Sequence, residues 1–228
     1  MCGRYTLAAP DPVQVRVRFP IGETVEVRRR FNVAPGDEVL AVTTDREGAP
    51  RGEELRWGLV PHWASGPTSP LKMINARAET LTEKPAFRDA FGRFRCLILA
   101  DGFYEWQAGD GRKRAFHITR NDGAPFAFAG VWSIWRSESA EVRSCAIITT
   151  AANRTVAPLH DRMPVILDPE AEAAWLDPSA PRPLLAELLT PLADAETRVR
   201  SVGPAVNDAR YDGPECLASP QDLAPTLF

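Results

Sequence analysis

The sequence predicts a single α+β domain, built on a curved, mainly antiparallel β-sheet or barrel with helices at its periphery. Three observations predict this fold class. The 21 prolines and 15 glycines among 228 residues divide the chain into short segments. Most of these segments are rich in β-branched or aromatic residues, as strands are. They follow one another with few helices between them, which is typical of antiparallel sheets.

The individual elements follow from local patterns. The predicted strands are residues 38–43, 55–60, 95–100, 115–119, 126–135, 142–149, 164–167 and 197–202. Residues 169–176 form the clearest predicted helix, because Asp168 suits the N-cap and Pro169 the first helical position. Residues 184–189 and 79–91 are further helical candidates, the second interrupted by Pro85. Residues 12–19 are ambiguous, since alternating valines favour a strand and Asp11-Pro12 favours a helix start.

Composition gives no sign of a second domain. We expect residues 1–220 to form one domain and residues 221–228 a flexible tail. The longest apolar runs, 96–100 and 145–148, are too short to cross a bilayer. The N-terminus lacks a basic region followed by an apolar stretch, so we predict no signal peptide and a cytoplasmic location.

The four cysteines lie far apart in the sequence. Cys2, Cys96, Cys145 and Cys216 form no Cys-x-x-Cys pair, which argues against a disulfide framework and against a zinc site. Cys96 and Cys145 lie in apolar, strand-like runs and are expected to be small core residues. We therefore predict no metal and no cofactor.

Charge is distributed unevenly along the chain. Residues 168–228 hold four Lys/Arg and 11 Asp/Glu, a net charge of −7, within a chain whose total is −3. Residues 1–167 therefore carry a net charge of +4. A basic groove is compatible with this distribution, although charge alone does not establish one.

Cys2 is the first candidate for chemistry. Removal of Met1 would leave an α-amine and a thiol on adjacent carbons, with ordinary pKa values of about 8 and about 8.5. The amine of such a 1,2-aminothiol forms an imine with an aldehyde, and the thiol then closes a thiazolidine ring on the same carbon. Ring closure is intramolecular and gains a large effective molarity. The sequence thus predicts an aldehyde as partner.

Asn75 and Arg77 are the second candidates, in the segment NARAET. Residues two apart in an extended segment point the same way. Asn75 is then placed to hold a reacting oxygen or the Cys2 amine, while Arg77 grips a phosphate.

Glu105 is the third candidate, in the segment DGFYEW after a predicted strand. It lies between Tyr104 and Trp106, where partial desolvation would raise its pKa toward neutrality. Such a carboxyl can transfer protons during imine formation. Phe103 and the two flanking aromatic residues are expected to belong to the core.

His160 is the fourth candidate, in the segment HDRMP just before a predicted strand. A histidine with a pKa near 6.5 can protonate the ring oxygen of a closed sugar hemiacetal, which releases the aldehyde. Arg162 is placed to hold a second phosphate. His62 and His117 are read as structural.

Together these segments resemble one family, the SOS-response-associated peptidases (SRAP), whose members process abasic sites in DNA. The resemblance covers nearly the whole chain and rests on the combination and order of its motifs. They are CGRY, FNVAP, WGLVPHW, NARAET, DGFYEW, IITT and HDRMP.

The resemblance implies that mature Cys2 forms a covalent thiazolidine link to abasic sites in single-stranded DNA, with Asn75, Glu105 and His160 as supporting catalytic residues. The family's phosphate-contacting arginines match Arg4, Arg77 and Arg162. Two further residues, Pro35 and Trp63, match segments that meet the bases beside the lesion, although Ala64 follows Trp63 where some members have a second Trp. The family further implies a monomer, with no membrane partner, that associates with the nucleoid when bound to DNA.

Three other functions stay open on the sequence. Glutamine amidotransferases of the Ntn type also begin Met-Cys-Gly and use the mature cysteine as nucleophile; here, however, Arg4 follows, which suits a phosphate better than an amide. A thiol autopeptidase activity, recorded in the family name, is the second. A non-enzymatic single-strand binder that stacks bases and holds phosphates is the third.

Overall fold

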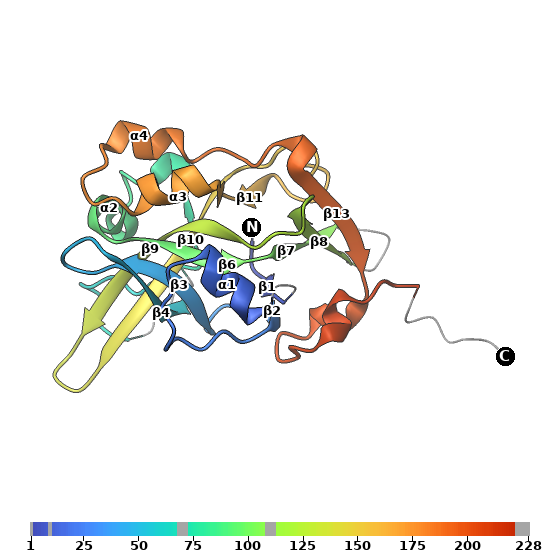
Figure 1. Cartoon of the computed structure of the whole chain (residues 1–228), viewed down its shortest axis with the longest axis horizontal. Coiled ribbons are helices and arrows are strands. Elements are labelled where there is room, and N and C mark those ends of the chain that lie inside the picture. The colour runs from blue at the N-terminus through green and yellow to red at the C-terminus, as the bar shows by residue number, and fades with distance from the viewer. Residues whose placement is uncertain (1, 9–10, 68–72, 108–112, 222–228) are drawn as a thin grey trace.

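Five strands of the computed structural model close into a small barrel (Figure 1). The structure describes residues 2–8, 11–67, 73–107 and 113–221. Around the ring each strand pairs with the next, and β10 pairs with both β9 and β4, which closes it. Among these pairings, the β10–β4 contact is parallel. The strands are β4 (Pro50–Trp57), β3 (Glu38–Thr44), β6 (Arg95–Ala100), β9 (Phe126–Arg136) and β10 (Glu141–Ala151).

Three short strands extend this ring. β5 (Asn75–Arg77) and β11 (Arg162–Pro164) both pair with β10, and β12 (Ile166–Leu167) pairs with β9. A second, five-stranded sheet packs against the barrel in the order β13-β8-β7-β1-β2. Its strands are β13 (Thr197–Val202), β8 (Arg114–Arg120), β7 (Gly102–Gln107), β1 (Tyr5–Leu7) and β2 (Arg30–Val33). The first described strand, β1, thus belongs to the second sheet, beside the barrel.

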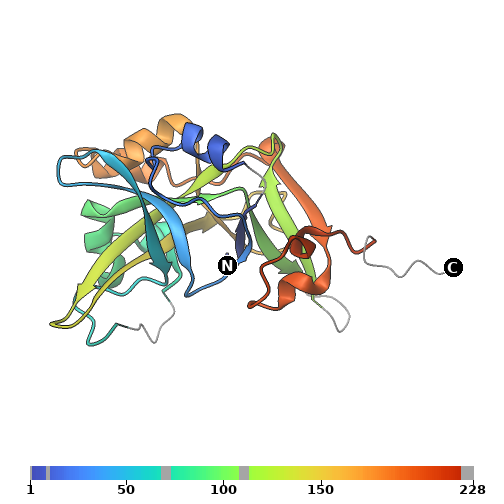
Figure 2. The ribbon, with the colours of Figure 1, turned by 60° about the horizontal axis from the view of Figure 1, so that its bottom comes forward.

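The described residues form four short helices, which pack on the outside of the barrel (Figure 2). Each has proline at one of its first two positions, where the missing N–H costs nothing and the fixed φ favours the first turn. The helices are α1 (Pro12–Arg18), α2 (Pro85–Arg93), α3 (Pro169–Leu176) and α4 (Arg182–Glu187). Single 3₁₀ turns occur at Ala78–Thr80, Asp194–Glu196, Pro204–Asn207 and Pro214–Leu217.

Side chains alternate in direction along the barrel strands and divide the hydrophobic core into two clusters. In β6, Leu97 and Leu99 face the helices, where they join Trp175 of α3. Their neighbours Cys96 and Ile98 face the other way, into a cluster that contains Cys2. Because side chains alternate along a strand, one strand serves both layers. Cys2 is thus part of the inner core.

The predicted fold class is confirmed, and most predicted strands recur within a residue or two at each end. Two boundaries differ for physical reasons. The strand predicted at 55–60 spans Pro50–Trp57. It ends at Trp57 because Gly58 has a φ of 135°, outside the range of a strand. The helix predicted at 79–91 begins only at Pro85, because proline is accepted at the start of a helix and not within it. Residues Ala78–Thr80 form a separate 3₁₀ turn.

Other elements were ambiguous or missed. The 12–19 segment is a helix, begun by Asp11, whose carboxylate accepts a hydrogen bond from the Val13 N–H at 2.9 Å. Asp168 occupies the N-cap position of α3 without a capping hydrogen bond and instead pairs with Arg120. The predicted strand 164–167 is split into β11 and β12. Strands β1, β2, β5 and β7 were not predicted.

Within the described ranges no helix is long and apolar enough to span a membrane. The expected tail lies largely outside these ranges, since they end at residue 221, so it stays a prediction. All four cysteines are buried and free, which confirms Cys96 and Cys145 as core residues.

Candidate functional site

Cys2 is fully buried just before β1, where β1 meets β7. Tyr5 pairs with Phe103, and the Tyr104 N–H donates to the Arg4 carbonyl at 3.0 Å. Continuing this antiparallel register toward the N-terminus brings Gly3 opposite Glu105 and Cys2 opposite Trp106, and the Glu105 carboxylate is near enough to act on the Cys2 thiol. The Cys2 thiol lies 3.9 Å from the Arg4 carbonyl oxygen, a distance compatible with a weak S–H hydrogen bond.

Glu105 lies in the middle of β7 and is only 3% exposed. Burial raises the pKa of its carboxyl above the ordinary value, and the nearby His160 acts in the opposite direction. Sequence reasoning placed this residue after the predicted strand 95–100, between two aromatic residues that desolvate it. The structure instead places it inside a strand, paired with Phe116 of β8, which explains its strong desolvation.

Asn75 reaches the same point from the barrel. β5 pairs in parallel with β10, with Asn75 opposite Ile147. The Asn75 side-chain amide donates to the Cys2 carbonyl at 2.7 Å. Its other polar atom, Oδ1, is buried and accepts no hydrogen bond from the described residues. A buried acceptor without a donor is costly, so this oxygen is available for a ligand or a new donor.

His160 approaches from the loop between β10 and β11. The Gln107 side chain at the end of β7 donates to the Pro158 carbonyl at 3.4 Å, which ties this loop to the Glu105 strand. The backbone N–H of Arg162 donates to His160 Nδ1 at 2.9 Å. A neutral His160 ring therefore carries its proton on Nε2. The Asp161 carboxylate lies 2.8 Å from the same Nδ1 and pairs with it only when the ring is protonated.

The four predicted catalytic residues therefore converge at the seam between the two sheets. Cys2 and Glu105 come from the second sheet, and Asn75 and His160 come from elements attached to β10. Burial raises the pKa of the Cys2 thiol, and the Glu105 carboxylate raises it further. The thiol is thus held in its protonated form beside a carboxyl that can accept its proton.

Arg4 has an internal role in this structure. Its guanidinium donates to the Asn32 side chain at 2.8 Å and to the Val206 carbonyl at 3.0 Å, and it lies 5.7 Å from the Trp106 ring centre. Asn32 is itself fixed by the Tyr211 carbonyl at 2.7 Å. Arg4 therefore fastens the N-terminal segment to the C-terminal 3₁₀ turns.

Arg77 and Arg162 both lie next to β10. Arg77 is exposed and pairs in register with Thr149. Arg162 pairs with Ala151 and makes a two-point ion pair with the Glu79 carboxylate, at 2.7 and 2.9 Å. This ion pair holds the pKa of Glu79 below its ordinary value, so Glu79 is ionised at neutral pH.

Pro35 and Trp63 line two different cavities. Pro35 is exposed in the turn after β2 and lines a cavity of about 420 Å³ together with Trp57 and Ile74, the residue before Asn75. Trp63 is 57% exposed and lines a separate cavity of about 600 Å³ beside α2. The structure thus places Pro35, but not Trp63, in the cavity that Ile74 lines beside Asn75.

Sequence reasoning missed three residues around the site. Glu79, Asn32 and Trp106 all lie within recognised motifs, yet their partners are far away in sequence. Glu79 is 83 residues from Arg162, and Asn32 is 28 residues from Arg4. No local pattern could have identified these pairs. In the described part of the chain no group of three or more His, Cys, Asp or Glu side chains is placed to hold a metal.

The chain is similar to curated proteins that are named for abasic-site processing. Abasic site processing protein YoaM of Bacillus subtilis is 40% identical over 95% of this chain and 97% of its own length. Abasic site processing protein HMCES of Xenopus tropicalis is 32% identical over 96% of this chain and 78% of its own.

Solved structures give the same fold. A phage-related protein of Bordetella bronchiseptica superposes with a TM-score of 0.71 at 31% identity, over 92% of this chain and 99% of its own. A Bacteroides thetaiotaomicron protein superposes with a TM-score of 0.84 at 24% identity, over 96% and 99%. Residues 1–209 match the family described as SOS response associated peptidase (SRAP). The chain therefore belongs to the SRAP family.

Proposed function

We propose that this protein captures abasic sites in single-stranded DNA as a covalent thiazolidine on Cys2, after removal of Met1, and so protects the lesion. The convergence of Cys2, Asn75 and Glu105 carries this proposal. A 1,2-aminothiol reacts selectively with aldehydes, and an abasic site is a DNA lesion that presents one. The family relatives, which are named for abasic-site processing, support the same substrate.

The reaction balances without a cofactor. The Cys2 amine adds to the aldehyde carbon, and loss of one water gives an imine. The sulfur then bonds to that carbon, and the thiol proton ends on the ring nitrogen. Asn75 Oδ1 is positioned to accept a hydrogen bond from the amine, since Nδ2 of the same side chain already donates to the Cys2 carbonyl.

The electrostatics of the site suit these proton transfers. Because the pKa of the buried thiol is raised, sulfur needs a base as it bonds to carbon. The pKa of Glu105 is also raised by burial, which makes its carboxylate a stronger base than an ordinary one. His160, once its ring carries a second proton, is the candidate acid that opens the sugar hemiacetal through its Nε2–H.

Intact mass spectrometry tests the proposal directly. Protein mixed with a single-stranded oligonucleotide containing one abasic site should gain the mass of the oligonucleotide less one water, and the reacting species should lack Met1. The same oligonucleotide with its aldehyde reduced to an alcohol is the control. A product of equal yield with the reduced oligonucleotide would rule out aldehyde chemistry.

The Glu79–Arg162 ion pair leads to a second prediction. The Glu79 carboxylate holds Arg162 at two points, as a DNA phosphate would. If a DNA phosphate displaces the Glu79 carboxylate from Arg162, Glu79→Gln should tighten binding of single-stranded DNA. The gain should be about two- to fivefold, which corresponds to the usual free energy of a surface ion pair. Fluorescence anisotropy at fixed salt measures this affinity.

A double-mutant cycle separates this local effect from a general change in charge. The gain from Glu79→Gln should disappear when Arg162→Gln is also present. Glu138→Gln, which removes one exposed carboxylate from the turn between β9 and β10, is the charge-matched control. Weaker binding by Glu79→Gln would show instead that Glu79 holds Arg162 in its DNA-binding position.

A further inference from the structure

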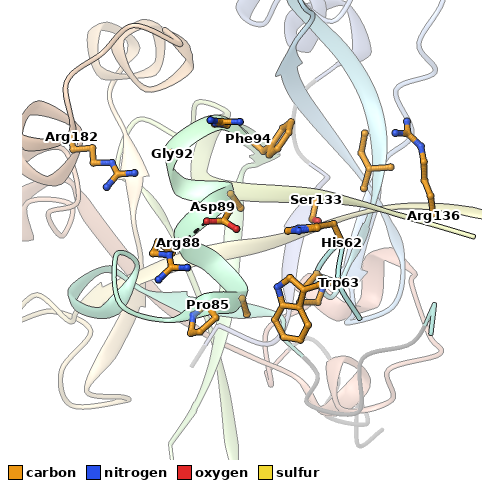
Figure 3. Close-up of a pocket in the computed structure, with 15 residues that line it drawn as sticks. His62, Trp63, Pro85, Arg88, Asp89, Gly92, Phe94, Ser133, Arg136 and Arg182 are labelled. Carbon is orange, nitrogen blue, oxygen red and sulfur yellow. Dashed lines mark ion pairs between the residues drawn. The ribbon is translucent and has the colours of Figure 1, made fainter. Parts of the chain in front are cut away.

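A second basic feature lies away from Cys2. We call it the arginine cleft: the cavity of about 600 Å³ between α2, the 61–64 loop and β9 (Figure 3). The Trp135 indole N–H donates to the Ala64 carbonyl at 2.8 Å, and the Val60 N–H donates to the Ser144 hydroxyl at 2.8 Å. These bonds fix the loop wall of the cleft to the barrel.

The cleft carries an excess of positive charge. Four arginines line it, Arg88, Arg93, Arg136 and Arg182, against the single carboxylate of Asp89. Arg136 is paired with Glu141 at 2.8 Å, and Arg88 lies 3.7 Å from Asp89. Neither Arg93 nor Arg182 makes an ion pair with any residue that the structure describes. Two guanidinium groups are thus available to an anion.

Aromatic surface accompanies this charge. Trp63 is 57% exposed and Phe94 is 40% exposed, and both line the cleft. In Figure 3 Trp63 lies beside His62, and Arg182 extends from the opposite side toward α2. Exposed aromatic rings beside unpaired arginines are the combination that binds single-stranded nucleic acid, through base stacking and phosphate contacts.

The cleft lies within reach of the candidate site. Gly58 and Ile74, the residue before Asn75, line one cavity, and Pro61 lines the arginine cleft. The three residues of chain from Gly58 to Pro61 span at most about 10 Å, so the two cavities are close neighbours. A strand held at Asn75 can therefore continue into the cleft.

We propose that the arginine cleft binds the nucleotides of the same single strand that lie beyond the bases next to the lesion, with Arg93 and Arg182 holding their phosphates. This inference rests on the proposed function for its choice of ligand. It adds α2 and α4 to the DNA path, and neither helix contributes a residue to the family motifs. The cleft would raise affinity for long single strands without taking part in the chemistry.

The test compares oligonucleotides of two lengths. Undamaged single strands of about 6 and about 14 nucleotides are bound to wild type and to Arg93→Gln/Arg182→Gln, with affinity read by anisotropy. Wild type should gain about tenfold or more from the added length, since hydrogen bonds to charged groups are strong. The variant should lose most of this gain. For the variant, the slope of log binding constant against log salt concentration should be less steep by about 1.4. Each of the two phosphates that it no longer neutralises accounts for about 0.7.

The control removes two exposed arginines elsewhere, in Arg28→Gln/Arg154→Gln, whose side chains are 69% and 96% exposed. The proposal is overturned if the control loses as much of the length-dependent affinity as the cleft variant, or if the cleft variant keeps the full gain. It is also overturned if affinity rises only when the added nucleotides are double-stranded. Covalent capture of a short abasic strand, measured in parallel, reports the Cys2 site independently and should be unchanged in the cleft variant. Failure of that capture in wild type would concern the proposed function alone.

Discussion

Replacing Cys2 with alanine should reduce the DNA adduct that survives denaturation by more than about 100-fold. The variant keeps the α-amine and can still form an imine, but it has no sulfur to close the ring. An imine hydrolyses when the site is denatured, whereas intramolecular ring closure makes the adduct persist. Denaturing gel electrophoresis of protein mixed with an abasic single strand measures the difference.

Borohydride separates the amine from the thiol in this experiment. Hydride addition to the imine carbon gives a stable amine, so borohydride should restore a cross-link to Cys2→Ala. Cys216→Ala removes another buried, free thiol and should cross-link as wild type does. Equal survival of the wild-type and Cys2→Ala adducts without borohydride would show that sulfur takes no part.

Replacing Glu105 with glutamine should slow adduct formation by about 10²- to 10⁴-fold, the usual range for a positioned acid or base. Glutamine keeps the shape of the side chain and removes its ability to carry a proton. The carboxylate is the active form, so the wild-type rate should rise with pH through the Glu105 pKa. Since burial raises that pKa, this rise should occur above the ordinary glutamate range. Quenched time courses across pH measure it.

Glu172 provides a matched control for this substitution. It is also a buried glutamate, 5% exposed, whose pKa is raised by burial, but it pairs with Arg18 of α1 on the helical side of the barrel. Glu172→Gln should leave the rate and its pH profile unchanged. A rising limb that persists in Glu105→Gln would assign the titration to another group.

The sequence predicted the long strands well, because they depend on local patterns, whereas the catalytic roles of the candidate residues stay a prediction. β6 and β9 are apolar runs, and Cys2 is defined by its position in the chain. Strand β7 was missed because its sequence, GFYEWQ, mixes aromatic and polar residues and becomes a strand only by pairing with β1 and β8. The burial of Glu105 follows from this pairing.

The features that the sequence could not predict depend on contacts between residues far apart in the chain. Arg4 was predicted to contact phosphate, and in the structure it bonds to Asn32 and Val206, which are 28 and 202 residues away. Its role toward DNA stays a prediction. The arginine cleft could not be predicted either, because Arg182 reaches it from α4 and Trp63 from the loop after β4. Only tertiary folding brings these residues to one cavity.

The burial of Cys2 also bears on how the protein survives in a damaged cell. Oxidants attack the thiolate form of cysteine, and exposed thiols of low pKa are the most susceptible. Cys2 is fully buried and its thiol pKa is raised. The sulfur is thereby shielded from peroxide while no aldehyde is bound. We therefore expect this burial to keep the proposed nucleophile chemically intact until the protein meets its substrate.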